Sequence, residues 1–138
     1  MNSYLLAVLA ALAACALASK QTVGARGTLM CGNQPLAGAT VKLWELDVFP
    51  DPDDELAKVK TDAQGRFQIS GSESEITTID TVVKIYHNCN NKWGLCKRKV
   101  TYKVPSSYVN KGSNVNKWYD LGVLNMEAKI KGEETECI

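Results

Sequence analysis

Only one side chain in this sequence ordinarily titrates near neutral pH, the imidazole of His87. General acid–base catalysis needs such a group beside a partner. The sequence contains no Gly-x-Ser-x-Gly motif, phosphate-binding loop or His-Glu-x-x-His motif to supply one. His87 alternates with Val83 and Ile85, which places it at the end of a strand, where loop backbone can satisfy its ring. We therefore expect no catalytic residues and no enzymatic activity.

Acidic residues with a calcium-like spacing follow the second apolar segment. Six acids and no base lie between positions 45 and 55, and Asp51, Asp53 and Glu55 alternate as in an EF-hand loop. The sixth loop position, which needs glycine, is Leu56, and the twelfth is Asp62 instead of glutamate. We expect a short helical turn or a tight acidic loop in contact with solvent, with no metal ion and no cofactor.

A second stretch is basic and holds the best candidates for binding. Positions 81–117 carry eight bases and no acid. Lys97, Lys99 and Lys103 alternate onto one exposed strand face, and Lys92 and Trp93 lie at the tip of the preceding loop. Lysines beside a tryptophan suit anionic phospholipid headgroups, and a sulfated glycan or an acidic cell-surface protein would satisfy the same charges. The alternative is that Trp93 folds back and the lysines only keep an edge strand soluble.

The acidic and basic stretches allow two outcomes. They either form two faces of opposite charge, or they interleave on folding and cancel. Because the formal net charge is only +1, nucleic acid is not an expected partner.

The start of the chain predicts export. An apolar run from Leu5 to Ala18 ends in Ala16-Leu17-Ala18, which is typical of a secretory signal peptide cut after Ala18. The run is too short for a transmembrane segment. Leu12 to Cys15 also fits a bacterial lipoprotein box, but the preceding residues lack the usual base. We expect a signal peptide over 1–18 and one secreted, extracellular domain over 19–138.

Cleavage there leaves four cysteines, Cys31, Cys89, Cys96 and Cys137. An even number in a small exported domain predicts two disulfides, and four cysteines allow three pairings. We expect Cys89 to close a short loop with Cys96, and Cys31 to hold the tail through Cys137. Zinc bound by the cysteines, with or without His87, is the alternative, but Cys-x6-Cys lacks the tight spacing of structural zinc sites.

The elements that must position these residues are short strands. Alternating apolar residues predict about seven strands, near residues 23–31, 41–45, 58–61, 66–70, 83–87, 97–104 and 121–130. Residues 62–65, Asp-Ala-Gln-Gly, predict a hairpin turn between the third and the fourth. This pattern predicts an all-β fold, a two-sheet antiparallel sandwich.

Eight short segments carry little information singly, but their order along the chain is informative: 23–32, 41–45, 53–56, 61–67, 85–89, 96–98, 104–108 and 119–122. Together with the four cysteines they resemble the nematode transthyretin-like proteins over nearly all of residues 19–138. The resemblance implies an exported, prealbumin-like β-sandwich, with a function that is undefined in most members. A carboxypeptidase-regulatory-type sandwich shares the Thr-Asp-x-x-Gly-x-Phe pattern but lacks the cysteine set.

The same fold carries the hydroxyisourate hydrolases, whose sites use paired histidines, an arginine and a terminal Tyr-Arg-Gly-Ser. This chain has one histidine and ends in Thr135-Glu136-Cys137-Ile138, so that activity is not expected. We expect a secreted binding protein that recognises anionic lipid or glycan surfaces or bridges to a receptor. The alternative is a carrier of a small hydrophobic ligand in a transthyretin-like oligomer, and the sequence leaves the oligomeric state open.

Overall fold

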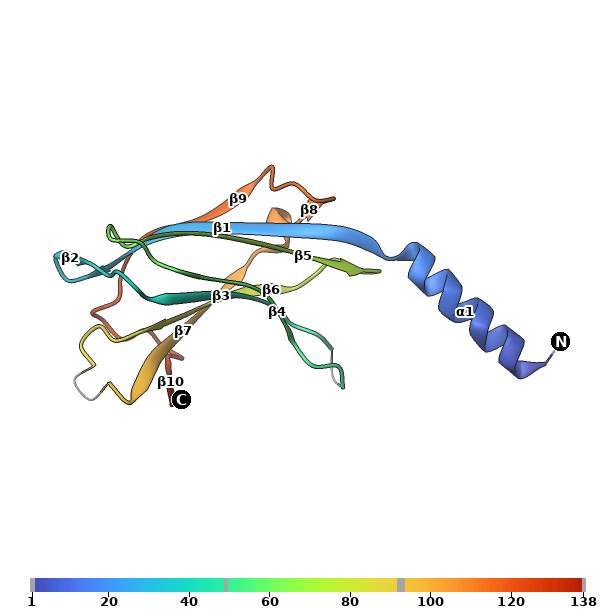
Figure 1. Ribbon diagram of the computed structural model, residues 1–138, viewed down its shortest axis with the longest axis horizontal. Helices are drawn as coiled ribbons and strands as arrows, with labels where there is room; N and C mark the ends of the chain where they lie inside the picture. Colours follow the sequence, from blue (N-terminus) through green and yellow to red (C-terminus); the bar gives the residue numbers. More distant parts are fainter. Residues whose placement is uncertain (1, 49, 92–93, 138) are drawn as a thin grey trace.

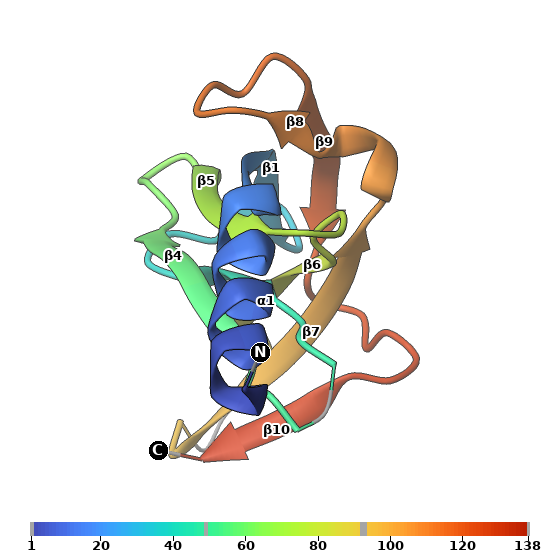
Figure 2. The ribbon, with the colours of Figure 1, turned by 90° about the vertical axis from the view of Figure 1, so that its right-hand side faces the viewer.

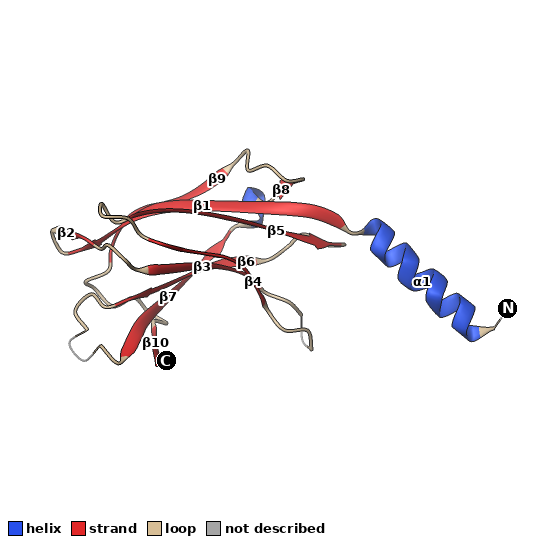
Figure 3. Cartoon of the chain, viewed as in Figure 1, coloured by secondary structure: helices blue, strands red, loops and turns tan. Residues whose placement is uncertain are grey.

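The computed structural model describes residues 2–48, 50–91 and 94–137, which form two facing β-sheets and one projecting helix (Figures 1 and 3). In chain order the elements are α1 (Ser3–Leu17), β1 (Ser19–Cys31), β2 (Gln34–Pro35), β3 (Thr40–Glu45), β4 (Asp54–Lys60), β5 (Arg66–Glu75), β6 (Thr81–His87), β7 (Cys96–Val104), a 3-10 turn η1 (Ser106–Tyr108), β8 (Asn110–Lys111), β9 (Trp118–Asn125) and β10 (Glu134–Cys137).

Each sheet has five strands. In the first, which we call the β1 sheet, the long β1 pairs with β2, β5, β8 and β9. In the second, the β6 sheet, the order is β10-β7-β6-β3-β4. The predicted all-β sandwich is confirmed. The short β2, β8 and β10 raise the strand number above seven, and β9 pairs with β1 in the parallel direction.

The core lies between the sheets and follows the predicted alternation. Val23 and Leu29 of β1 face the interior, as do Leu43 of β3 and Val83 and Ile85 of β6, and all five are fully buried. Each such side chain contributes about 1.5–3 kcal/mol relative to an exposed position. Burial of one face of each strand therefore fixes the register and sends the alternate residues to the outer faces.

The turn at residues 62–65 does not make the predicted hairpin. Asp62 Oδ1 accepts hydrogen bonds from the N–H groups of Gln64 and Arg66, at 2.9 and 2.8 Å, so a tight turn is present. However, β4 pairs with β3, while β5 pairs with β1 in the opposite sheet. The Thr61 hydroxyl accepts a hydrogen bond from the Ala39 N–H, and the Thr61 N–H donates one to the Ala39 carbonyl. This anchors the chain beside β3 before it crosses to the β1 sheet.

Of the two alternatives predicted for the acidic segment, the described residues show the loop, and β4 begins at Asp54. The end of the last long strand differs from the prediction. The last long strand ends at Asn125, because the Asn125 side-chain oxygen accepts hydrogen bonds from the N–H groups of Gly32 and Glu127, both at 3.1 Å. Met126 then enters the core, whereas Ala128 and Ile130, which lie within the predicted strand, are exposed.

Helix α1 projects from the end of the sandwich where β1 begins (Figure 1). Among the described residues, no helix combines the length and apolar character needed to cross a bilayer. The signal peptide and its cleavage after Ala18 stay predictions.

The four cysteines form two disulfides, but the predicted pairing is wrong. Cys31 bonds to Cys89, and Cys96 bonds to Cys137. Cys89 faces inward beyond the end of β6 and meets the end of β1, so this bond joins the two sheets. Cys96 lies directly opposite Cys137, because the C-terminal residues form β10 on the edge of β7. Proximity in sequence favoured Cys89 with Cys96, whereas strand pairing placed each beside a distant partner.

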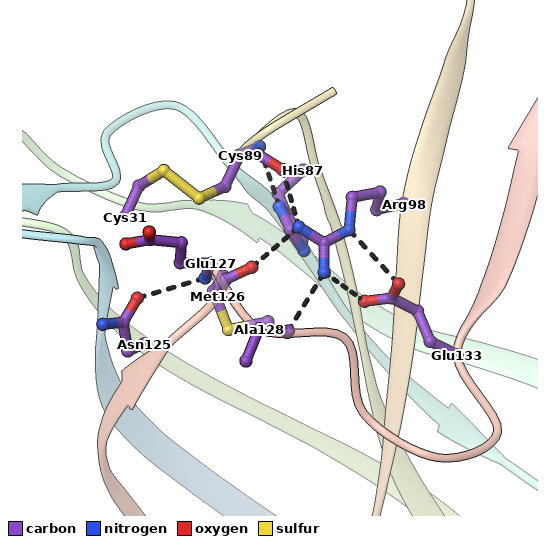
Figure 4. Close-up of polar contacts among 9 residues, drawn as sticks. All are labelled: Cys31, His87, Cys89, Arg98, Asn125, Met126, Glu127, Ala128 and Glu133. Atoms are coloured by element: carbon purple, nitrogen blue, oxygen red, sulfur yellow. Dashed lines mark hydrogen bonds and ion pairs between the residues drawn. A yellow bond between two sulfur atoms is a disulfide. The ribbon is translucent and has the colours of Figure 1, made fainter. Parts of the chain in front are cut away.

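A buried arginine connects the segments at this end of the sandwich (Figure 4). Arg98 of β7 is 5% exposed and donates hydrogen bonds to the carbonyl oxygens of Cys89, Met126 and Ala128 at 2.6, 2.8 and 3.1 Å. Its guanidinium also makes two bonds to the carboxylate of Glu133, at 3.2 and 2.8 Å. Arg98 therefore holds together β7, the segment after β6 and the chain that leads to β10.

His87 is also buried here, with 2% exposure. Its Nδ1 accepts a hydrogen bond from the Cys89 N–H at 3.0 Å, as expected of a strand-end histidine bound by loop backbone. Its Nε2 has no partner among the described residues. Burial, followed by the nearby positive charge of Arg98, lowers the pKa of His87 to about 4.

Replacement of Arg98 by methionine should lower the free energy of unfolding by about 3 kcal/mol, because it leaves the carboxylate of Glu133 buried without its partner. Arg26→Met is the control, since Arg26 pairs with Asp120 at the surface, with side chains 49% and 55% exposed, and should cost less than about 1 kcal/mol. Urea unfolding of the oxidised proteins measures both. Equal losses would contradict the role given to Arg98.

The lowered pKa of His87 predicts acid sensitivity. As the pH falls below 6.5, the ordinary pKa of histidine, His87 becomes protonated in the unfolded chain. In the folded chain it stays neutral until about pH 4. Stability should therefore fall by about 2–3 kcal/mol as the pH drops through that window. His87→Gln keeps an acceptor for Cys89 and should remove this part of the slope. Denaturant titrations at pH 7 and 4.5 test it, and parallel pH profiles would refute it.

Candidate functional site

The outer face of the β6 sheet carries a concentration of lysines and aromatic rings. They occupy the positions that alternate with the core residues of β3, β6 and β7, and with the half-buried Val59 of β4. We call this surface the basic face, and it comprises Lys42, Trp44, Lys58, Lys60, Lys84, Tyr86, Lys97, Lys99 and Lys103.

Three of these lysines lie in one row across the sheet. Lys42 of β3 is directly opposite Lys58 of β4 on one side and Lys84 of β6 on the other. Directly opposed residues in antiparallel strands have Cβ atoms about 5 Å apart, and like charges in such pairs destabilise a sheet. The row therefore needs neighbouring groups, or a ligand, to offset its repulsion.

Neighbouring groups of the protein itself offset part of this repulsion. Lys42 Nζ lies 3.4 Å from Glu55 Oε1 and 5.1 Å from the centre of the Tyr86 ring. Lys84 Nζ lies 4.4 Å from the centre of the Trp44 ring, a cation–π contact. Burial, followed by the positive charge of Lys99, lowers the pKa of Lys84. Lys58 makes no ion pair within the described part of the chain.

A hollow opens beside this row. It measures about 160 Å³ and is lined by Thr40, Lys42, Lys58, Tyr86, Lys97 and Glu136. Three ammonium groups and two hydroxyl-bearing side chains around one concavity provide donors for a phosphate or sulfate group. One carboxylate at the rim opposes such an anion.

Strand β10 limits the charge of the face. It runs along β7 (Figure 2), with Glu134 opposite Lys99 and Glu136 opposite Lys97. Lys99 Nζ lies 3.8 Å from Glu134 and 3.7 Å from Glu136, and its side chain is only 15% exposed. Burial, and next the negative charge of Glu136, raises the pKa of Tyr86. The acidic C-terminal strand therefore neutralises one edge of the basic face.

The predicted binding residues differ in their surroundings. Lys97 lines the hollow, and Lys99 is covered by its two glutamates. Lys103 is 73% exposed and lies 3.8 Å from Asp80. Lys92 and Trp93 lie outside the described residues.

Sequence reasoning overlooked Lys42, Lys58, Lys84, Trp44 and Tyr86. The sequence pattern that could have identified these residues is their alternation with inward-facing residues in three separate strands. Only the pairing of those strands shows that the five residues share one surface. No ion pair between described residues joins the acidic stretch to the basic stretch. The bases of β7 meet acids of β10 and Asp80, which lie outside the acidic stretch, and Glu55 meets Lys42, which lies outside the basic stretch.

A larger hollow on the β1 sheet makes an instructive contrast. It measures about 370 Å³, and its charged lining residues are Arg26, Arg66, Asp62 and Asp120. Arg26 Nε already pairs with Asp120 Oδ2 at 3.3 Å. Its charges balance, so it offers an anion less attraction than the smaller hollow on the basic face.

Comparison with known proteins identifies relatives that span this architecture. A sequence model described as the transthyretin-like family matches residues 26–105. Transthyretin-like protein 33 of Caenorhabditis elegans is 40% identical over 128 residues, covering 90% of each chain. Transthyretin-like protein 5 of the same nematode is 43% identical over 122 residues, covering 88% of each. Transthyretin-like protein 46 is 42% identical over 139 residues, covering 100% of this chain and 78% of its own. These matches confirm the resemblance inferred from the ordered segments, and the chain belongs to the transthyretin-like family.

Proposed function

We propose that this protein is a secreted, non-enzymatic binding protein that captures phosphate or sulfate groups on an extracellular surface through its basic face. The observation that carries the proposal is the row Lys58–Lys42–Lys84 beside the hollow that Lys97 and Tyr86 also line. An oxyanion in that hollow would supply the countercharge that the row lacks.

The surroundings support an anion over other ligands. The hollow is lined by Thr40, Tyr86 and three lysines, all of which can donate hydrogen bonds to an oxyanion. Two sources offer the same chemistry, a sulfated glycan and an anionic phospholipid headgroup. In both cases the attraction is between charges at the surface and should weaken as salt is added.

Secretion and the lack of catalysis belong to the same proposal. Two disulfides suit an oxidising compartment. The single histidine is buried, with its Nδ1 bonded to backbone, which removes the one candidate acid–base group from contact with a substrate. The ligand-carrier alternative depends on fold analogy alone.

Neutralising two lysines of the hollow should weaken anion binding. Lys58→Gln with Lys97→Gln should lower affinity about thirtyfold, at about 1 kcal/mol for each lysine near an anionic surface. Lys20→Gln with Lys111→Gln, on exposed positions of the β1 sheet, changes net charge equally and should have little effect. Retention on immobilised heparin and sedimentation with phosphatidylserine vesicles, with phosphatidylcholine vesicles as blank, measure the two sources separately.

Binding to one source alone identifies it, and binding to both shows that the oxyanion itself is recognised. The proposal fails if the wild-type protein binds neither. It also fails if the two double variants weaken binding to the same extent, because net charge would then explain the effect.

Removal of the acid at the rim should have the opposite effect. Glu136→Gln takes one negative charge from the hollow and should strengthen anion binding about fivefold, about 1 kcal/mol. Glu127→Gln, at an exposed loop position, is the matched control for net charge. The same heparin and vesicle measurements apply, and unchanged or weaker binding by the Glu136 variant would argue against the hollow as the site.

A further inference from the structure

The interior of the sandwich is acidic at one end, where an apolar lining would be expected. Glu45 is the last inward residue of β3, after Val41 and Leu43. Glu73 and Glu75 of β5, in the opposite sheet, have the same inward parity as Phe67. Polar residues at core positions lower stability, so their presence there points to a function. The two sheets therefore bring three glutamates toward one another at this end.

The carboxylates come close enough to share one ion. Oxygens of Glu45, Asp47 and Glu75 all lie within 4.8 Å of one another, and a second set joins Glu45 with Asp54 and Glu73. A cavity of about 310 Å³ adjoins them, and its lining combines five acids with two apolar residues and the loop between β5 and β6: Glu45, Asp47, Asp51, Glu75, Asp80, Leu46, Val48 and residues 77–79.

Unsatisfied buried groups at this point provide an independent indication of a ligand. Glu45 is 3% exposed, and its Oε2 has no hydrogen-bond partner within the described residues. Thr81, directly opposite Glu45 on β6, is 1% exposed, and its hydroxyl also has no described partner. Buried oxygens of this kind are nearly always bonded. Both would be satisfied by an ion or by its bound water.

The charges around Glu45 are unfavourable without a cation. Acids face it from β4 (Asp54), from β5 (Glu73 and Glu75) and from the residues after β3 (Asp47). The base recorded at the rim is Lys103, which lies 3.8 Å from Asp80.

The walls of the cavity are held in place by hydrogen bonds. Gln21 of β1 donates from Nε2 to the Thr77 carbonyl at 2.8 Å and accepts from the Ile79 N–H at 3.0 Å, which fixes the loop before β6. Asp53 Oδ1 accepts from the Asp47 N–H at 3.0 Å, which fixes the segment after β3. The proposed ligands therefore lie on anchored backbone.

We infer that Glu45, Asp47 and Glu75 form a binding site for one divalent cation of the size of calcium. Carboxylate oxygens are the ligands of hard cations, and bonds of 2.3–2.6 Å allow ligands on opposite sides of calcium to be up to about 5 Å apart. Magnesium, with bonds of about 2.1 Å, requires a tighter octahedron. Carboxylate oxygens that all lie within 4.8 Å of one another fit inside the span of a calcium coordination shell.

The proposed ligands differ from the residues of the basic face. Glu45 and Glu75 have inward parity at the end of the sandwich where β1 begins, whereas the lysines line the outer side of the β6 sheet, and only Lys103 is recorded beside a residue of the cavity, Asp80. The site also differs from the EF-hand pattern in the sequence, whose Asp51 and Asp53 are not members of either ligand set. Asp53 instead positions Asp47.

Calcium titration of the full oxidised protein, followed by thermal unfolding and calorimetry, tests the inference. We expect a dissociation constant of about 10⁻⁴–10⁻³ M, as in extracellular calcium modules. Calcium at tenfold excess over that constant should raise Tm by about 4 °C. Magnesium at the same concentration should raise it by less than half as much.

Variants separate the site from a general salt effect. Glu45→Gln should abolish the calcium-dependent shift and should not lower Tm in EDTA, because the amide keeps the size of the side chain and adds no charge to the acidic cluster. Asp47→Asn is a second variant at the site, and Glu55→Gln, on the outer face, is the matched control that should keep the full shift. The inference is overturned if wild type shows no shift up to 10 mM calcium, if Glu45→Gln retains it, or if magnesium acts equally.

Discussion

The buried guanidinium of Arg98 is the interaction on which much of this molecule depends. Its donors join backbone carbonyls from the segment after β6 and the segment after β9, and its pairing with Glu133 fixes the chain that enters β10. Without these contacts the glutamates of β10 would not be held opposite Lys97 and Lys99. Because Arg98 and the Cys96–Cys137 bond hold that strand against β7, they also determine how much of the lysine charge is neutralised.

The two proposed sites follow from the two sides of the same strands. Alternate residues of β3 point in opposite directions, so Lys42 and Trp44 reach the outer surface while Glu45 reaches the interior. On the outside, lysines are only partly balanced by Glu55, by aromatic rings and by β10. On the inside, acids from both sheets converge where apolar residues end. One register, set by burial of Val41 and Leu43, therefore determines both charge clusters.

The disulfides illustrate how sheet geometry overrides distance along the chain. A bond between Cys89 and Cys96 would close a short loop, which restricts the unfolded chain less than a long one. The observed bonds span 58 and 41 residues, and on the chain-entropy model each contributes about 4 kcal/mol before strain. One joins the two sheets and the other attaches an edge strand, which are the two weak points of a small sandwich.

The sequence by itself determined the fold class, most of the long strands, the presence of two disulfides and the family, because these depend on local alternation, residue type and ordered motifs. It also indicated that His87 would be bonded by loop backbone. Tertiary structure alone decided which strands pair, and therefore the cysteine partners, the crossing at Asp62, and the grouping of Lys58, Lys42 and Lys84. Parity along one strand shows which residues share its face, but not which other strand lies beside it. Arg98 shows the limit of the pattern: in the sequence it is one base of a basic stretch, and its carbonyl partners and Glu133 come from segments that only folding brings together.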